Sequence, residues 1–383
     1  MSAPAVTPSR EQGRRPRRQA SRLGWLGMIA MAGLPLLVAG CVFTPPLGTT
    51  GPARALGWVA QQSGTGNNLF GVCATSVNDA WAVGEAGLLL STSDGGAHWR
   101  SVSSGTREDL WGVTFTDGLH GWLLADHQVI RTSDAGKSWS VVRLSSTLDL
   151  RALEFTDPLH GIVVGLIWRG NRQVGIILRT LDGGEHWVTA WEQNPAFPVD
   201  GTVELIAIGV VDRQRIVAAS QTGVVLSTTD GGESWSLAAN SDSAAGIQSL
   251  AFPAESRGWA VGFGGRIMET PDGGRTWRRR ETNDRSDLYA VAFPSQTEGW
   301  AVGDNGALLR TLDSGAHWSF VPGLPRSRQL EAESFVNSGH GWAVGEDGTI
   351  YAYRQSVGTI GGLSSNVNHR ATPPVGYVSA TSP

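Results

Sequence analysis

Cysteine, lysine and tyrosine are scarce in this chain of 383 residues, which holds two cysteines, one lysine (Lys137) and four tyrosines. Two cysteines are too few for a zinc cluster or a disulfide framework. The eight histidines occur singly, without the spacing of metal ligands. The formal net charge of −4 argues against a nucleic-acid-binding protein. We therefore expect no metal, no cofactor and no nucleic-acid partner.

Glycine and tryptophan, in contrast, are abundant. Hydrophobic residues make up 40% of the chain and charged residues only 17%, which is enough apolar material for a sizeable core. The 51 glycines follow no Gly-X-Y period, so a collagen-like chain is excluded. Together with 16 tryptophans they indicate many turns and many aromatic side chains that pack between elements.

The N-terminal segment has the features of an export signal. Residues 1–22 carry six arginines and one acidic residue, and the remainder of the chain has a net charge of −9. An apolar run from Leu23 to Gly40 follows and ends in Val38-Ala39-Gly40-Cys41. This end resembles a bacterial lipobox, so we expect residues 1–40 to be a lipoprotein-type signal peptide and Cys41 to be lipidated.

An uncleaved transmembrane anchor is the alternative, because eighteen apolar residues are just long enough to span a bilayer. Both alternatives place the body outside the cytoplasm. We expect residues 41–56 to be a flexible tether and residues 57–354 to fold. Residues 355–383 are rich in Ser, Gly, Asn, Thr and Pro without a period, and we expect a disordered tail. Cys73, in a strand-like run, is predicted to be a buried, inert thiol.

One octet occurs six times, with Thr, Asp, Gly and Trp at its first, third, fifth and eighth positions; the first copy runs from Thr92 to Trp99. The aspartates are Asp94, Asp134, Asp182, Asp230, Asp272 and Asp313. Asp can cap a tight turn, Gly allows a positive φ, and Thr and Trp favour the flanking strands. We expect each Trp to pack against the next unit. The octet resembles the Asp-box of sialidase-like propellers, in which this Asp is structural.

Four short strands can be recognised in each unit of 40–48 residues, which is typical of a β-propeller blade. Seven first strands start between Leu69 and Leu330, but the seventh unit stops before its fourth strand. The segment Gly57-Trp58-Val59-Ala60 stands alone before the first unit. We therefore predict an all-β, seven-bladed propeller of four-stranded antiparallel blades, closed by an N-terminal strand that completes the last blade.

Residues 55–354, with their repeated Gly-Trp-Ala-Val-Gly strand and Asp-box, resemble the photosystem II stability/assembly factor family. The resemblance implies a non-catalytic scaffold that holds a membrane protein or assembly intermediate, in the thylakoid lumen if the host is photosynthetic. From the leader we expect the protein to be lipid-anchored in the periplasm or on the outer face of the cytoplasmic membrane. We expect a monomer. Members of the family also carry an arginine-rich patch implicated in partner contact.

We looked for that patch from the expected geometry. The boxes and the turns between strands one and two should share one face, and the remaining turns and the links between blades should share the other. That second face should receive the arginines and tryptophans that we propose as partner-binding residues. They are Trp168, Arg169, Arg172, Trp191, Arg266, Arg279 and Arg285.

An extracytoplasmic glycoside hydrolase or glycan-binding propeller is the alternative function. A paired-carboxylate glycosidase would need acidic groups on the central face. The candidates there are Asp126, Glu192, Asp304 and Glu346. A sialidase-like centre would need a Tyr–Glu nucleophile pair and an early Arg-Ile-Pro motif; the motif is absent and only four tyrosines exist: Tyr289, Tyr351, Tyr353 and Tyr377. We expect no catalytic residues.

Overall fold

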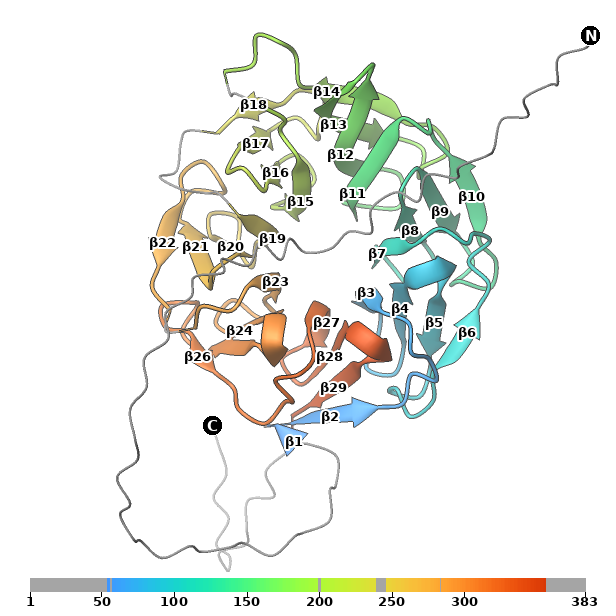
Figure 1. Ribbon diagram of the computed structural model, residues 1–383, viewed down its shortest axis with the longest axis vertical. Coiled ribbons are helices and arrows are strands. Elements are labelled where there is room, and N and C mark those ends of the chain that lie inside the picture. The colour runs from blue at the N-terminus through green and yellow to red at the C-terminus, as the bar shows by residue number, and fades with distance from the viewer. Residues whose placement is uncertain (1–53, 56, 199–200, 239–245, 283, 356–383) are drawn as a thin grey trace, which may run out of the picture. The chain divides into compact units, whose positions relative to one another are not determined.

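The computed structural model describes residues 54–355, except 56, 199–200, 239–245 and 283. Seven antiparallel sheets surround a central axis, which confirms the predicted propeller (Figure 1). The expected signal peptide (1–40), the lipidation at Cys41 and the tail from residue 356 onward lie outside the described residues. Among the residues described, no helix is long and apolar enough to span a membrane.

Each of the first six sheets runs from its inner strand, next to the axis, to its outer strand in chain order. The strands of the first three blades are β3 (Leu69–Ala74), β4 (Ala80–Gly84), β5 (Leu89–Thr92) and β6 (Arg100–Val102); β7 (Leu110–Phe115), β8 (Gly121–Ala125), β9 (Gln128–Thr132) and β10 (Ser140–Arg143); and β11 (Leu148–Phe155), β12 (Gly161–Arg169), β13 (Arg172–Thr180) and β14 (Val188–Glu192).

Blades four to six repeat this order, with outer strands of two or three residues. Their strands are β15 (Leu205–Val210), β16 (Ile216–Ser220), β17 (Val225–Thr228) and β18 (Ser236–Leu237); β19 (Ile247–Ala251), β20 (Gly258–Gly262), β21 (Arg266–Thr270) and β22 (Arg278–Arg280); and β23 (Leu288–Ala292), β24 (Gly299–Gly303), β25 (Leu308–Thr311) and β26 (Ser319–Phe320).

The seventh blade joins the two ends of the described chain. It contains β27 (Leu330–Asn337), β28 (His340–Gly345) and β29 (Ile350–Arg354), and its fourth strand is β2 (Trp58–Gln61). Trp58 pairs with Tyr353 in an antiparallel ladder, so the predicted closure is confirmed; β2 lies beside β29 in Figure 1. A two-residue strand, β1 (Arg54–Ala55), pairs with β2 as a fifth strand, within the segment that we expected to be tether.

The core lies between neighbouring blades, where a second-strand Trp meets a Phe from the next blade. Trp122 stacks on Phe155 with ring centroids 3.6 Å apart, and Trp300 stacks on Phe335 at 5.8 Å. Both tryptophans are almost completely buried. Buried aromatic pairs of this kind contribute about 1 kcal/mol beyond their area, so the repeat itself holds the ring together.

The Trp of the Asp-box packs on the preceding blade, which corrects the expectation that it packs on the next one. Trp139, in the second blade, lies edge-on to Trp81 of the first blade. Trp318, in the sixth, lies edge-on to Trp259 of the fifth. At these contacts the box Trp joins the pair that the second-strand Trp of the preceding blade makes with a Phe, as Trp139 does with Phe115 and Trp318 with Phe293.

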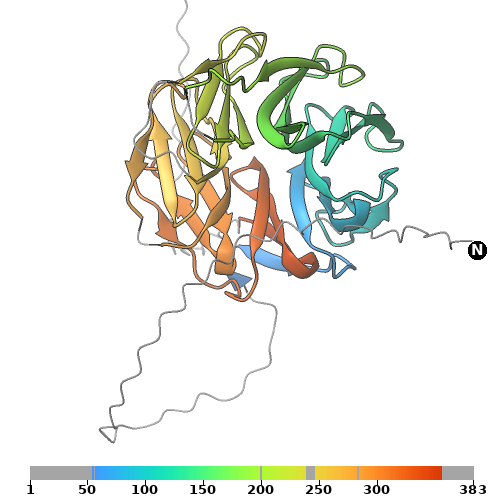
Figure 2. The ribbon, with the colours of Figure 1, turned by 45° about the horizontal axis from the view of Figure 1, so that its top comes forward.

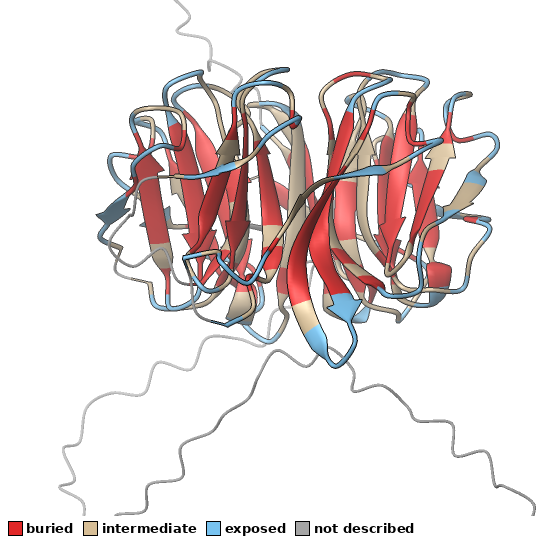
Figure 3. Cartoon of the chain, turned by 90° about the horizontal axis from the view of Figure 1, so that it is seen from above, coloured by how far each residue is buried: buried red, intermediate tan, exposed pale blue. Residues whose placement is uncertain are grey.

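Three short 3₁₀ helices occupy turns between second and third strands: η1 (Glu85–Gly87), η2 (Asp304–Gly306) and η3 (Glu346–Gly348). In the tilted view of Figure 2 the inner strands stand around the axis. The side view of Figure 3 shows buried strands between two faces of partly exposed and exposed turns. These two faces are the surfaces that the propeller offers to other molecules.

Candidate functional site

Hydrogen bonds between turns define the two faces. In all six boxes the amide after the Asp donates to a carbonyl of the turn between strands one and two, as from Gly95 to Asn78 and from Gly183 to Leu159. We call this side the box face. On the opposite side, which we call the link face, the Ala86 amide of η1 donates to Asp109 in a link between blades. This arrangement agrees with the geometry that we used to place the arginines.

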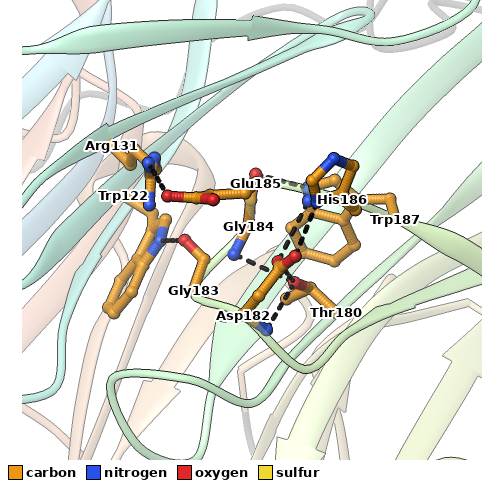
Figure 4. Close-up of polar contacts among 9 residues, drawn as sticks. All are labelled: Trp122, Arg131, Thr180, Asp182, Gly183, Gly184, Glu185, His186 and Trp187. Atoms are coloured by element: carbon orange, nitrogen blue, oxygen red, sulfur yellow. Dashed lines mark hydrogen bonds and ion pairs between the residues drawn. The ribbon is translucent and has the colours of Figure 1, made fainter.

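The Asp-box is a closed hydrogen-bonded turn, shown for the third blade in Figure 4. The Thr180 hydroxyl donates to Asp182 Oδ1 at 2.8 Å and accepts from the Gly184 amide at 2.9 Å. Asp182 also accepts from the amide of His186 at 3.0 Å. The indole of Trp122, from the preceding blade, donates to the Gly183 carbonyl at 2.9 Å. The carboxylate is therefore occupied by its own turn.

The electrostatics of the boxes agree with a structural role. Hydrogen bonds from the amide and side chain of His98 hold the pKa of Asp94 at about 2. Desolvation raises the pKa of Asp182, but hydrogen bonds from His186 and Thr180 outweigh it and lower the pKa to about 2. Such carboxylates remain ionised and cannot deliver protons near neutral pH.

The third box also brings together Asp182, Glu185 and His186, a group in which three ligand atoms lie within 4.8 Å of one another. All three residues already have partners. Glu185 forms an ion pair with Arg131 at 2.5 Å, and His186 Nδ1 lies 2.8 Å from Asp182 Oδ2. The cluster is thus explained by contacts within the protein (Figure 4).

Four predicted partner-binding residues lie in the third blade. Trp168, Arg169 and Arg172 are exposed at the tip of the β12–β13 hairpin, whose tip reaches past the lower face of the ring in Figure 3. Arg169 forms a two-bond contact with Glu192, at 2.7 and 2.6 Å. Trp191 is only partly exposed and packs edge-on against Phe197. Trp168 and Arg172 of this hairpin are therefore exposed to a binding partner. Arg169 is exposed as well, but it is already held in an ion pair with Glu192.

The other three predicted residues lie in and after the fifth blade. Arg266 starts β21, Arg279 lies on the outer strand β22, and Arg285 lies in the following link. Burial and the nearby charge of Arg279 lower the pKa of Arg266. The fourth blade separates this group from the hairpin (Figure 1). The seven residues thus form two groups on the link face and not one patch.

Sequence reasoning missed a ring of residues at the inner strands. All seven inner strands have a β-bulge at the same place, one residue after a buried Leu or Ile. The bulge residues, which we call the bulge ring, are all partly exposed. They are Phe70, Trp111, Arg151, Ile206, Gln248, Tyr289 and Glu331. Bulges re-aim side chains, and Phe70 and Trp111 of neighbouring blades stack at 4.7 Å.

Carboxyl groups gather beside this ring. Burial raises the pKa of Glu331 to about 7, and the charges of Glu346 and Asp304 contribute. Burial and nearby carboxylates, Asp304 and Glu346 among them, raise the pKa of Tyr289 well above its usual value, so its hydroxyl stays protonated at neutral pH. Glu331 is therefore the one group of the ring that can exchange a proton near neutral pH.

The carboxylates that we considered for a glycosidase do not form one pair. Asp126 accepts a hydrogen bond from the indole of Trp111 at 2.8 Å, and Glu192 is held by Arg169. Asp304 and Glu346 start η2 and η3, in the sixth and seventh blades. Those two lie near Glu331, whereas Asp126 and Glu192 belong to the second and third blades.

Comparison with known protein families gives one match to this chain. A family model described as photosynthesis system II assembly factor YCF48 matches residues 52–150 and 238–330, together half of the chain. No curated protein matches.

Solved structures show the same fold. The chain is similar to YCF48 from Cyanidioschyzon merolae, at 21% identity and a TM-score of 0.65, with 79% of this chain and 99% of that chain covered. It is similar to a structure described as YCF48 bound to D1 peptide, at 23% identity and a TM-score of 0.63, with the same coverage.

Enzymes share this fold as well. The GH74 xyloglucanase from Xanthomonas campestris is 15% identical, with a TM-score of 0.57, and the match covers 80% of this chain and 54% of that chain. Identities this low establish a common architecture and leave function to be argued from the site.

Proposed function

The chain belongs to the family of the photosystem II assembly factor YCF48, and from this we propose that it is a non-catalytic scaffold that docks and stabilises a partner polypeptide during assembly of a membrane protein complex. The family match is the observation that carries the proposal. A structure of a 23% identical propeller is described as bound to D1 peptide, which supports a polypeptide as the class of ligand.

We place the contact on the link face, at the β12–β13 hairpin. Trp168 is 43% exposed, which is unusual for a side chain of its size in a body whose other tryptophans pack between blades. Exposed Trp beside Arg is the composition of an interface anchor. Arg172 makes no ion pair with any described residue, so a partner can engage it without breaking an existing contact.

We further propose that the propeller works outside the cytoplasm, tethered to the membrane by lipid on Cys41. The support is the sequence Val38-Ala39-Gly40-Cys41 after a basic and apolar leader. In membrane fractionation, the Cys41→Ser variant should move from the membrane to the soluble fraction. If the variant stays in the membrane and its chain is as long as that of the wild type, the N-terminal segment is an uncleaved transmembrane anchor and not a lipoprotein signal.

The docking proposal is tested by crosslinking in native membranes, followed by identification of the captured chain. The wild type should capture an integral membrane protein. Arg169→Glu combined with Arg172→Glu should reduce the capture at least about tenfold, because a tenfold change requires only about 1.4 kcal/mol. Arg275→Glu, an exposed arginine in a box turn on the other face, is the matched control and should capture as the wild type does.

The glycosidase alternative has one observation in its favour, the raised pKa of Glu331 beside Glu346 and Asp304. A carboxyl with a raised pKa next to an ionised one is the arrangement of a general acid and its partner. A panel of aryl glycosides tests it directly. Hydrolysis that is lost in Glu331→Gln would establish the enzyme and contradict the scaffold as the complete function.

A further inference from the structure

A pocket lies at the link between the first and second blades, and none of its lining residues was a candidate from the sequence. Its volume is about 570 Å³ and it is open to solvent. Its lining comprises Ser103, Gly105, Thr106, Arg107, Glu108 and Arg143. Two segments form it: the link that follows β6, and the last residue of the outer strand β10.

Both arginines of this pocket are available to a ligand. Arg107 and Arg143 are exposed, and within the described residues neither forms an ion pair. Many other arginines of the propeller are paired, including Arg131 with Glu185 and Arg328 with Asp347. Two guanidinium groups without an ion pair among the described residues share this concavity with one carboxylate, Glu108, so the pocket keeps a net positive charge.

Of the residues that line the pocket, Glu108 also contacts two polar side chains of the second blade, His127 and Gln128, which lie behind the lining. The Glu108 carboxylate accepts a hydrogen bond from Gln128 and lies 3.1 Å from His127 Nε2. Gln128 is only 6% exposed and lies opposite Arg143 in the β9–β10 ladder. Glu108 Oε2, His127 Nδ1 and Gln128 Oε1 are buried atoms that have no hydrogen-bond partner among the described residues. Buried polar groups are normally partnered, so three such atoms together distinguish this site from an ordinary structural network.

The charge of the pocket selects the class of ligand. Guanidinium groups match the geometry of carboxylates and phosphates. Glu108 offsets part of the charge of Arg107 and Arg143, so the pocket favours a singly charged carboxylate over a doubly charged phosphate. Because the pocket is open, a carboxylate attached to a longer chain can enter while the rest of that chain stays outside.

We propose that the Arg107–Arg143 pocket binds a carboxylate of the partner polypeptide, supplied by its chain end or by an acidic side chain. The polypeptide nature of the ligand rests on the proposed function. The pocket itself is a separate site, because it lies between the first two blades whereas the docking hairpin belongs to the third.

Binding of short peptides to the full-length protein tests the proposal. The probes are N-acetyl-Ala-Ala-Leu with a free carboxylate, the same peptide as its C-terminal amide, N-acetyl-Ala-Glu-Ala amide, and inorganic phosphate. Saturation-transfer NMR reports binding of each. The free acid, the glutamyl peptide or both should bind at least about tenfold more tightly than the uncharged amide, and the comparison between them identifies the source of the carboxylate.

Arg107→Gln combined with Arg143→Gln should weaken the carboxylate peptides at least about tenfold, while Arg275→Gln should bind them as the wild type does. Equal binding of acid and amide, unchanged binding by the double variant, or preference for phosphate would each overturn the proposal. Thermal unfolding of the variants shows whether they are folded. Membrane crosslinking that fails while peptide binding succeeds would count against the docking scaffold and leave the pocket in place.

Discussion

Trp58, on the strand before the first blade, lies edge-on to Trp300 of the sixth blade, with ring centroids 5.5 Å apart. It also contacts Tyr353 and Phe335 of the seventh. The side chain thus joins the strand that closes the ring to two blades at once. It is fully buried, so closure of the ring is a packing event as much as a hydrogen-bonded one.

Trp58→Ala should therefore destabilise the whole propeller and not only its last blade. Loss of a buried Trp typically costs about 3–5 kcal/mol, and here the lost contacts include those that keep β2 in place. The free energy of unfolding in urea measures the effect. The exposed Trp168→Ala serves as the control and should change stability by less than about 1 kcal/mol. Equal effects of the two changes would contradict this role of Trp58.

Gly315→Ala, in the sixth Asp-box, should lower the stability of the protein more than Gly170→Ala does. A Cβ at Gly315 would lie 2.1 Å from a ring atom of buried Trp259, whereas a Cβ at Gly170 would meet nothing within 4 Å. Both residues have positive φ, so both variants carry a backbone cost of about 1 kcal/mol. The difference between their urea midpoints isolates the steric term, and equal midpoints would show that Trp259 moves aside freely.

The Asp-boxes should make the protein sensitive to acid. The pKa of Asp182 is lowered to about 2 in the folded state, below its value in an unfolded chain. Its stabilising contribution is therefore present above about pH 4 and is lost as the pH falls through 2. Asp182→Asn should lower the melting temperature at pH 7, and the difference from wild type should shrink toward pH 2. A difference independent of pH would contradict this account.

Much of the fold could be predicted because it repeats. The octet from Thr92 to Trp99 contains its own turn chemistry, so six copies locate six strand–turn–strand units without tertiary information. The closing strand could be predicted as well, since Trp58 precedes the first unit and the last unit lacks a fourth strand. Local pattern and chain order were sufficient for both.

The site could be predicted only in part, because it depends on distances between blades. Sequence places Arg169 and Arg285 on one face but does not show that the fourth blade separates them. It does not reveal the pairing of Arg169 with Glu192, which follows from the length of the β12–β13 hairpin. The bulge at Arg151 depends on the register between two strands, which the sequence of one strand alone does not reveal.

Comparison of the repeats with one another could have revealed the bulge ring. The bulge residue always follows the buried residue that starts the inner-strand pairing, as Phe70 follows Leu69 and Trp111 follows Leu110.

A carboxyl whose pKa is raised by burial should make the protein less stable as the pH rises, whereas the Asp-box carboxylates make it less stable as the pH falls. Burial raises the pKa of Glu154 to about 7, despite a hydrogen bond from Thr114. The folded state keeps this proton over a range in which the unfolded chain releases it. The free energy of unfolding should therefore fall as the pH rises from about 4.5 to 7. Glu154→Gln should remove part of this fall and stabilise the protein at pH 8 by up to about 3 kcal/mol, as measured by urea unfolding. A variant less stable than wild type at pH 8 would contradict this sign.

The thiol of Cys73 should be inert in the native protein and reactive only after unfolding. The residue as a whole is partly exposed, and not buried as the sequence predicted, but desolvation of the thiol raises its pKa to about 12. At pH 8 the thiolate, which is the reactive form, is therefore about 10³-fold rarer than in a thiol of ordinary pKa. In a Cys41→Ser background Cys73 is the only cysteine, and its reaction with a maleimide can be followed by mass spectrometry. Native labelling should be slower than labelling in concentrated guanidinium chloride by two to three orders of magnitude, on the order of the difference in thiolate content.

Because Cys73 lies on the inner strand β3, the rate of native labelling then measures how often the first blade opens. Ligands that bind the closed ring should slow it further, whereas equal rates in the native and unfolded states would show that the thiol is open to solvent.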